Sequence, residues 1–100
     1  MKKHYLRIAK SLNSFINSLN SSLENKDLAI LHELVVDLKT SLPETLAYEN
    51  SKLLLDGLRV TSVDDMESYV TKLVKKLDEI KNYYLTKSRR WFFLLIFTVL

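Results

Sequence analysis

The sequence predicts an all-α protein, an antiparallel bundle of about four helices whose last helix continues into an apolar carboxyl-terminal segment. The chain has 100 residues, one domain's worth, and 47% of them are hydrophobic. Gly and Pro occur once each, at Gly57 and Pro43, whereas a β-rich domain needs turn residues every ~8–12 positions. Apolar residues recur at intervals of three and four, which is the period of one helix face.

The first two helices are predicted over residues 3–23 and 26–40. In the first, one face is apolar: Tyr5, Ile8, Leu12, Phe15, Ile16, Leu19 and Leu23. A polar stretch follows, and Asn25 is the expected cap of the second helix. The apolar side of the second helix holds Leu28, Leu31, Leu34, Val35, Leu38 and Leu42.

The third helix is predicted over residues 42–56. Ser41 and Glu44 fit a capping box around Pro43, which is tolerated in a first helical turn. At the other end, Gly57 suits a left-handed position after the helix, with Leu58 folding back on the helix as in a Schellman ending.

The fourth helix is predicted to begin after Thr61 and Ser62, where Asp64 and Asp65 suit a first turn. It carries a heptad that we expect to form the core or an oligomer seam: Met66, Tyr69 or Val70, Leu73, Leu77, Ile80 and Tyr84. No Pro or Gly interrupts it before Leu100, so it could run unbroken for ~55 Å. We therefore divide the chain into a helical bundle, residues 1–86, and a terminal segment, residues 87–100.

The terminal segment ends in ten residues without a charge, of which only Thr98 is polar. A helix that is apolar on every side is surrounded by apolar material. The basic run 87–90 followed by an aromatic residue is typical of a helix crossing the headgroup layer. These residues are predicted to enter a membrane: Trp91, Phe92, Phe93, Leu94, Leu95, Ile96, Phe97, Val99 and Leu100.

The length of this apolar run leaves three alternatives open. A complete span needs ~20 apolar residues, about twice the number present. The run could belong to a transmembrane helix that continues past Leu100, it could insert partly, or a partner protein could cover it. If it enters a membrane, the positive-inside rule places residues 1–90 on the cytoplasmic side.

Charge is strongly segregated along the chain. All twelve acids lie between Glu24 and Glu79, where the net charge is −5, and the two ends carry a net charge of +8. An even number of antiparallel helices brings both ends of the chain to one end of the bundle. We predict contact with anionic lipid there through Lys2, Lys3, Arg7, Lys10, Lys87, Arg89 and Arg90. Cations near residue 90 also suit the dipole of a helix that ends there.

The sequence lacks the motifs and spacings that carry catalysis or metal binding. The chain has no Cys, which excludes disulfides, thiolate metal sites and cysteine nucleophiles. His4 and His32 have no carboxylate at metal-ligand spacing, and the acidic residues 64–67 are explained by helix capping. No phosphate loop, nucleophile elbow or zinc spacing occurs. We predict no enzymatic activity and no cofactor. We interpret Tyr83, Tyr84 and the basic run as an interfacial belt, with nucleic acid binding as the alternative.

Three functions fit this pattern. The first is a membrane-anchored interaction or assembly module on the cytoplasmic face, which binds a protein partner or a second copy through its helical faces, with Tyr48 and Leu55 as candidate contacts. The second is a sensing or oligomerising domain of a membrane signalling or channel-like effector, coupled through the unbroken last helix. The third is a structural subunit of a larger complex, with its apolar tail buried by neighbouring subunits.

Overall fold

The computed structural model describes the backbone of residues 2–99 and the side chains of residues 4–87. Within that part of the chain all regular structure is helical, which confirms the predicted fold class. The helices are α1 (Lys2–Glu24), α2 (Leu28–Ser41), α3 (Glu44–Glu49), α4 (Ser51–Leu58) and α5 (Val63–Val99).

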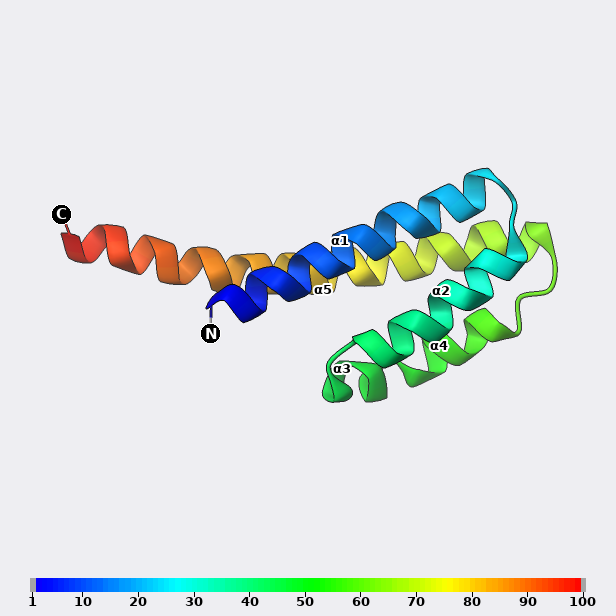
Figure 1. The fold of residues 1–100 in the computed structure, drawn as a ribbon, viewed down its shortest axis with the longest axis horizontal. Coiled ribbons are helices and arrows are strands. Elements are labelled where there is room, and N and C mark those ends of the chain that lie inside the picture. The colour runs from blue at the N-terminus through cyan, green and yellow to red at the C-terminus, as the bar shows by residue number, and fades with distance from the viewer. Residues whose placement is uncertain (1, 100) are drawn as a thin grey trace.

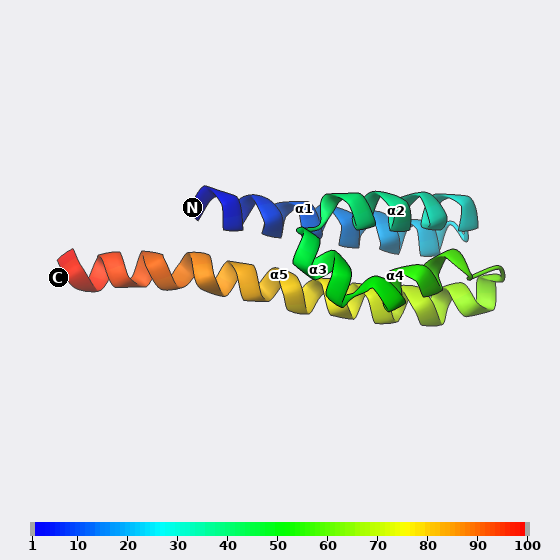
Figure 2. The same ribbon diagram turned by 90° about the horizontal axis from the view of Figure 1, so that it is seen from below.

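The chain direction alternates between α1, α2, α4 and α5, so the predicted antiparallel bundle is confirmed (Figure 1). Figure 2 shows two layers, one formed by α1 and α2 and the other by α4 and α5, with α3 as a short link between them. The most extensive contact joins α1 to α5, the first and last helices.

The heptad of α5 forms the centre of the core. Met66, Val70, Leu73 and Leu77 are at most 1% exposed, as the heptad predicts. Ile80 is also buried, and Tyr84 packs half-buried against the same cluster. The other helices supply a continuous apolar core around this stripe: Leu12, Ile16, Leu19, Leu31, Val35, Leu38, Leu42, Leu54 and Val60.

The link between α1 and α2 is a Schellman ending built on a residue other than glycine. Lys26 has a φ of 54°, in the left-handed region that favours glycine. The Lys26 amide donates to the Leu23 carbonyl at 3.1 Å and the Asp27 amide donates to Ser22 at 3.0 Å. Asp27 also caps α2, since its carboxylate accepts from the Ile30 amide at 3.1 Å. The predicted cap at Asn25 was therefore wrong by two residues.

The predicted single helix over residues 42–56 is two helices. Ser41 is the last residue of α2, and the cap of α3 at Pro43 has no side-chain hydrogen bond, so the predicted capping box is absent there. Asn50 leaves helical geometry, with φ −109° and ψ 15°. Its side-chain amide donates to the Leu46 carbonyl at 2.9 Å. Short polar side chains can form such local hydrogen bonds to backbone carbonyls, which makes them weak helix formers in the interior of a helix.

Gly57 lies inside α4 and does not adopt the left-handed conformation predicted for it. Its role is a close approach: a Cβ at this position would come within 2.6 Å of Cζ of Tyr69. Tyr69 is 7% exposed, and its hydroxyl donates to the Leu53 carbonyl at 2.8 Å. Burial, with a smaller effect of the Asp56 charge, raises the pKa of Tyr69 well above its usual range. Gly57 therefore lets α4 pack on the ring from α5.

Helix α5 begins at the predicted cap, where the Ser62 hydroxyl accepts from the Asp65 amide at 3.2 Å. It then continues without a break to Val99. Both views show it running on past the start of α1 with no other helix of the described chain beside it. That extension, residues 88–99, is ~18 Å long.

The transmembrane part of the prediction is not supported by the described helices. Across the described residues, no helix combines the length and the apolarity needed to cross a membrane. The side chains of the predicted inserting residues 91–100 lie outside the described part of the structure.

Candidate functional site

The start of α1 packs against α5 where α5 leaves the bundle. The ring of Tyr5, on the second turn of α1, lies 5.7 Å from the ring of Tyr84 on α5, with 35° between the planes. Tyr83 packs edge-on against Tyr84 at 5.4 Å. We call Tyr5, Tyr83, Tyr84 and Lys87 the terminal cluster. It follows from the antiparallel pairing of α1 and α5, which sets the start of one helix beside the late turns of the other (Figure 1).

Lys87 joins the two helices within this cluster. Its ammonium lies 4.8 Å from the centre of the Tyr83 ring and 5.8 Å from that of Tyr5, both within the range of a cation–π contact. Interaction with the Tyr83 side chain raises the pKa of Lys87, and burial raises the pKa of Tyr84.

The predicted basic residues lie at different distances along the helices from the terminal cluster. Arg7 is exposed on α1, next to the turn that carries Tyr5. Lys10 is exposed too, but it lies ~7.5 Å further along the helix axis from Tyr5. The backbones of four others lie in the first turn of α1 and in α5 just after Lys87, and their side chains are outside the described part: Lys2, Lys3, Arg89 and Arg90.

Acidic residues come closer to the terminal cluster than the linear charge pattern indicated. Glu49 at the end of α3 and Glu79 on α5 line a shared hollow with Tyr83 and Tyr84. The chain reverses after α2, so α3 returns to the side of α5. On its inner side, toward the bundle, the cluster has Glu49 and Glu79 together with Lys76, whose ammonium lies 3.9 Å from the Glu79 carboxylate.

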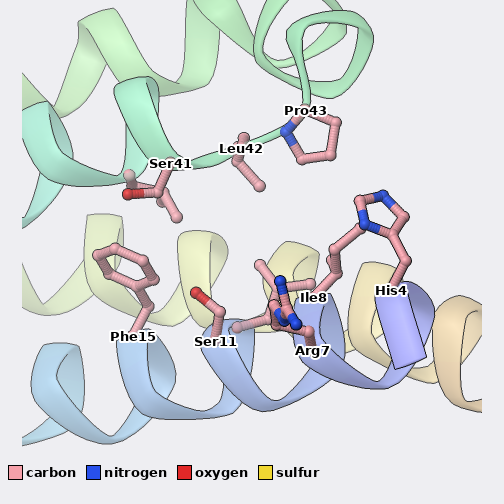
Figure 3. A pocket seen from close by; sticks show the side chains of 10 residues that line it. His4, Arg7, Ile8, Ser11, Phe15, Ser41, Leu42 and Pro43 are labelled. Atoms are coloured by element: carbon pink, nitrogen blue, oxygen red, sulfur yellow. The ribbon is translucent and has the colours of Figure 1, made fainter.

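A cavity of about 370 Å³ opens between the first half of α1 and the end of α2 (Figure 3). Its apolar wall includes Leu12, Leu38 and Leu42, which are at most 8% exposed. Figure 3 shows Ser41, Leu42 and Pro43 on one side and the α1 side chains on the other. The polar lining residues are His4, Arg7, Ser11 and Ser41, and no acid is among the lining residues.

His32 has a structural position. Its Nε2 atom lies 2.7 Å from the Val60 carbonyl oxygen, and the ring is half-buried. The contact ties α2 to the segment between α4 and α5. In the part of the chain that the structure describes, no three His, Cys, Asp or Glu side chains gather as a metal site would require.

No family model, curated protein or solved structure matches this chain. Function therefore has to be inferred from the terminal cluster, the cavity and the exposed faces themselves.

Sequence patterns identified these features only in part. The heptad identifies Tyr84 as a core residue and the basic run includes Lys87, but their contact with Tyr5 depends on the register of α1 against α5. Tyr5 and Tyr84 each sit on an apolar face, and antiparallel pairing of the first and last helices would have placed them together. The cavity has no such signal, because it depends on the angle between α1 and α2.

Proposed function

We propose that this protein is a non-enzymatic helical module that associates with an anionic membrane surface through its terminal end and binds a protein partner or a second copy through its helical faces. The observation that carries the proposal is the contact of Lys87 with the rings of Tyr5 and Tyr83. It supports a single basic end, formed by both ends of the chain, where α5 leaves the bundle.

The energetics of such an end favour a membrane surface. A basic residue near an anionic leaflet contributes ~1 kcal/mol, and the effect is screened beyond ~10 Å at moderate salt. Tyrosine rings suit the headgroup layer because they are amphipathic. As a helix, the apolar run 91–100 would extend ~15 Å, so it would pass from the headgroup layer into the hydrocarbon region. With the basic residues retained on the side they favour, residues 1–90 would face the cytoplasm.

Vesicle flotation tests the membrane part of the proposal. We expect the full chain to float with neutral vesicles and more strongly with vesicles that contain an anionic lipid. Replacing Lys2, Lys3, Arg7 and Lys10 with Gln should weaken binding to anionic vesicles by ~10²–10³-fold, at ~1 kcal/mol for each charge. Deleting residues 91–100 should remove binding to neutral vesicles and leave a weaker, salt-sensitive binding to anionic ones.

A variant with the same change in charge is the matched control. Gln at Lys39, Lys52, Lys72 and Lys75, all exposed and outside the terminal cluster, should leave vesicle binding within a few-fold of the unchanged chain. Equal losses of binding to anionic vesicles in the two variants would show that binding depends on net charge and not on the position of the basic residues. A full chain that stays in the aqueous fraction with both vesicle types would make the membrane proposal wrong.

The face formed by α2 and α4 supports the assembly part of the proposal. Val36, Leu55 and Leu58 are 49%, 47% and 40% exposed and line one hollow between these helices. Exposed apolar side chains that gather in this way mark interaction surfaces more often than isolated ones do. Tyr48 on α3 is exposed as well, as predicted, but does not line that hollow.

Sedimentation velocity in a non-micellar buffer tests this face against a second copy. If copies associate through it, Leu55→Ser should shift the equilibrium toward the monomer by about tenfold, because it removes most of one apolar side chain from the interface. Val63→Ser makes a comparable change at an exposed position on α5 and should have no such effect. A chain that is monomeric at every concentration tested would exclude the second copy.

A further inference from the structure

The cavity between α1 and α2 has the composition of a site for an amphiphile. Six of its ten lining residues are apolar: Ile8, Leu12, Phe15, Leu38, Leu42 and Pro43. Ligand sites are typically ~300–1,000 Å³, mostly apolar, with a few polar groups that orient the ligand. At about 370 Å³, this cavity is at the lower end of that range, which suits one chain and not a bulky ring system.

The charge of the lining selects the sign of the ligand. Arg7 contributes the one permanently charged group of the lining, and no carboxylate lines the cavity with it. Among the described residues, the ion pairs are formed by lysines of α5, and none involves Arg7. Figure 3 shows Arg7 and His4 on the α1 side of the opening, with the Ser11 hydroxyl beside them. A guanidinium in this setting is a strong donor to a carboxylate or phosphate oxygen.

The polar and apolar parts are arranged along α1. His4 and Arg7 lie toward the start of α1, and Phe15 lies two turns further into the bundle. A ligand with an anionic head beside Arg7 would therefore place its chain along the helix, toward Phe15 and Leu38. The head would then be at the same end of the bundle as the terminal cluster.

We propose that this cavity binds one single-chain anionic lipid, with the acyl chain along Ile8, Leu12 and Phe15 and the acidic head on Arg7. The inference deepens the proposed function, on which it rests for the supply of lipid from the membrane surface. It adds a site for one lipid molecule per chain to the general electrostatic attraction between the basic end and the membrane surface. The basic end would then hold one lipid molecule drawn partly out of the leaflet.

Titration calorimetry of the full chain with dodecanoate, kept below its micelle concentration, tests the site without a bilayer. We expect one dodecanoate for each chain. Arg7→Gln should weaken binding about tenfold or more, since hydrogen bonds to charged groups are among the stronger ones. Ser11→Phe should block the cavity from an exposed wall position, and Ser41→Phe should do the same from α2. Lys72→Gln, with the same loss of charge on α5, should bind as the unchanged chain does.

Two further ligands separate the chain from the head. Acetate should not bind measurably, because it has the carboxylate without the chain. Dodecyltrimethylammonium has the same chain with a cationic head and should bind at least tenfold more weakly than dodecanoate. Equal binding of both amphiphiles, or dodecanoate binding that is unchanged in Arg7→Gln and in both phenylalanine variants, would overturn the inference. Circular dichroism and a thermal midpoint for each variant show that a loss of binding is not a loss of folding.

The vesicle and dodecanoate experiments test the two proposals separately, and each can contradict one proposal without contradicting the other. Dodecanoate binding at Arg7 without vesicle flotation would support the cavity and contradict the membrane proposal. Vesicle flotation without stoichiometric dodecanoate binding would contradict the cavity and leave the basic end as a surface contact. Chemical-shift changes of the Ser11 and Leu42 backbone amides on adding dodecanoate should locate the ligand between α1 and α2.

Discussion

Replacing Leu73 with Ala is expected to lower the free energy of unfolding by about 2–5 kcal/mol, measured by urea titration. Leu73 is 1% exposed in the middle of the apolar stripe of α5 and belongs to the core that α1, α2, α4 and α5 share. Truncation removes buried methyl groups and leaves a space that the surrounding helices can close only in part. A loss of this size is a large part of the stability of a domain this small.

Lys75 supplies the matched control for Leu73. It is exposed two residues further along α5, and Lys75→Ala should change the free energy of unfolding by no more than ~0.5 kcal/mol. A loss below ~1 kcal/mol for Leu73→Ala would contradict its position in the core, since buried Leu→Ala changes cost several times more than surface changes.

Gly57→Ala is expected to destabilise the protein by about 1–2 kcal/mol, although Ala is the better helix former. In a helix interior Ala is favoured over Gly by up to ~1 kcal/mol, whereas overpacking typically costs ~1–3 kcal/mol. The new methyl group would come within 2.6 Å of Cζ of Tyr69, so the ring or α4 has to move. The same substitution in a Tyr69→Leu background should be neutral or stabilising. A stabilising effect of Gly57→Ala alone would show that the ring moves aside at no cost.

Alkaline pH gives a second measurement of the contact between Gly57 and Tyr69. Burial raises the pKa of Tyr69, so the fold favours the neutral hydroxyl. That stabilisation is complete below the unfolded-state pKa of ~10 and is lost as the pH rises above it. Thermal midpoints at increasing pH should therefore fall more steeply for the unchanged chain than for Tyr69→Phe. In Gly57→Ala the displaced ring is less buried, and the fall should be intermediate.

The apolar stripe of α5 was predictable because the helical period, the absence of Gly and Pro and the capping signal all indicated the same helix. Residues from Met66 to Tyr84 keep a helical period with no breaker, and Ser62 has a strong capping preference. The interruption at Asn50 was not predictable in the same way. Neither Gly nor Pro marks it, and the side-chain hydrogen bond from Asn50 to the Leu46 carbonyl has no pattern in the sequence that announces it. Local patterns fix the period of a helix better than its boundaries.

Gly57 and Lys26 also show that local propensity does not decide where a left-handed residue or a close helix contact occurs. Propensity assigns the left-handed position after a helix to the single glycine, yet the residue with positive φ is Lys26. Gly57 is instead used where two helices come close, a tertiary requirement that no local pattern records. The terminal cluster was half predictable: the charge segregation indicated a basic end, but the aromatic rings that join α1 to α5 follow from the register of the whole bundle.

The pairing of α1 with α5 has a consequence during synthesis. The apolar face of α1 includes Leu12 and Leu19, and its main partner, α5, is made only after the three helices between them. At ~5–20 residues per second, the ~60 residues between Leu19 and Leu77 take roughly 3–12 s to translate. For that time the first helix lacks the partner that covers it, and exposed apolar surface of this kind promotes aggregation. The six exposed Asn and Ser residues of α1 would keep the nascent helix weak and hydrated until α5 is made: Ser11, Asn13, Ser14, Asn17, Asn20 and Ser21.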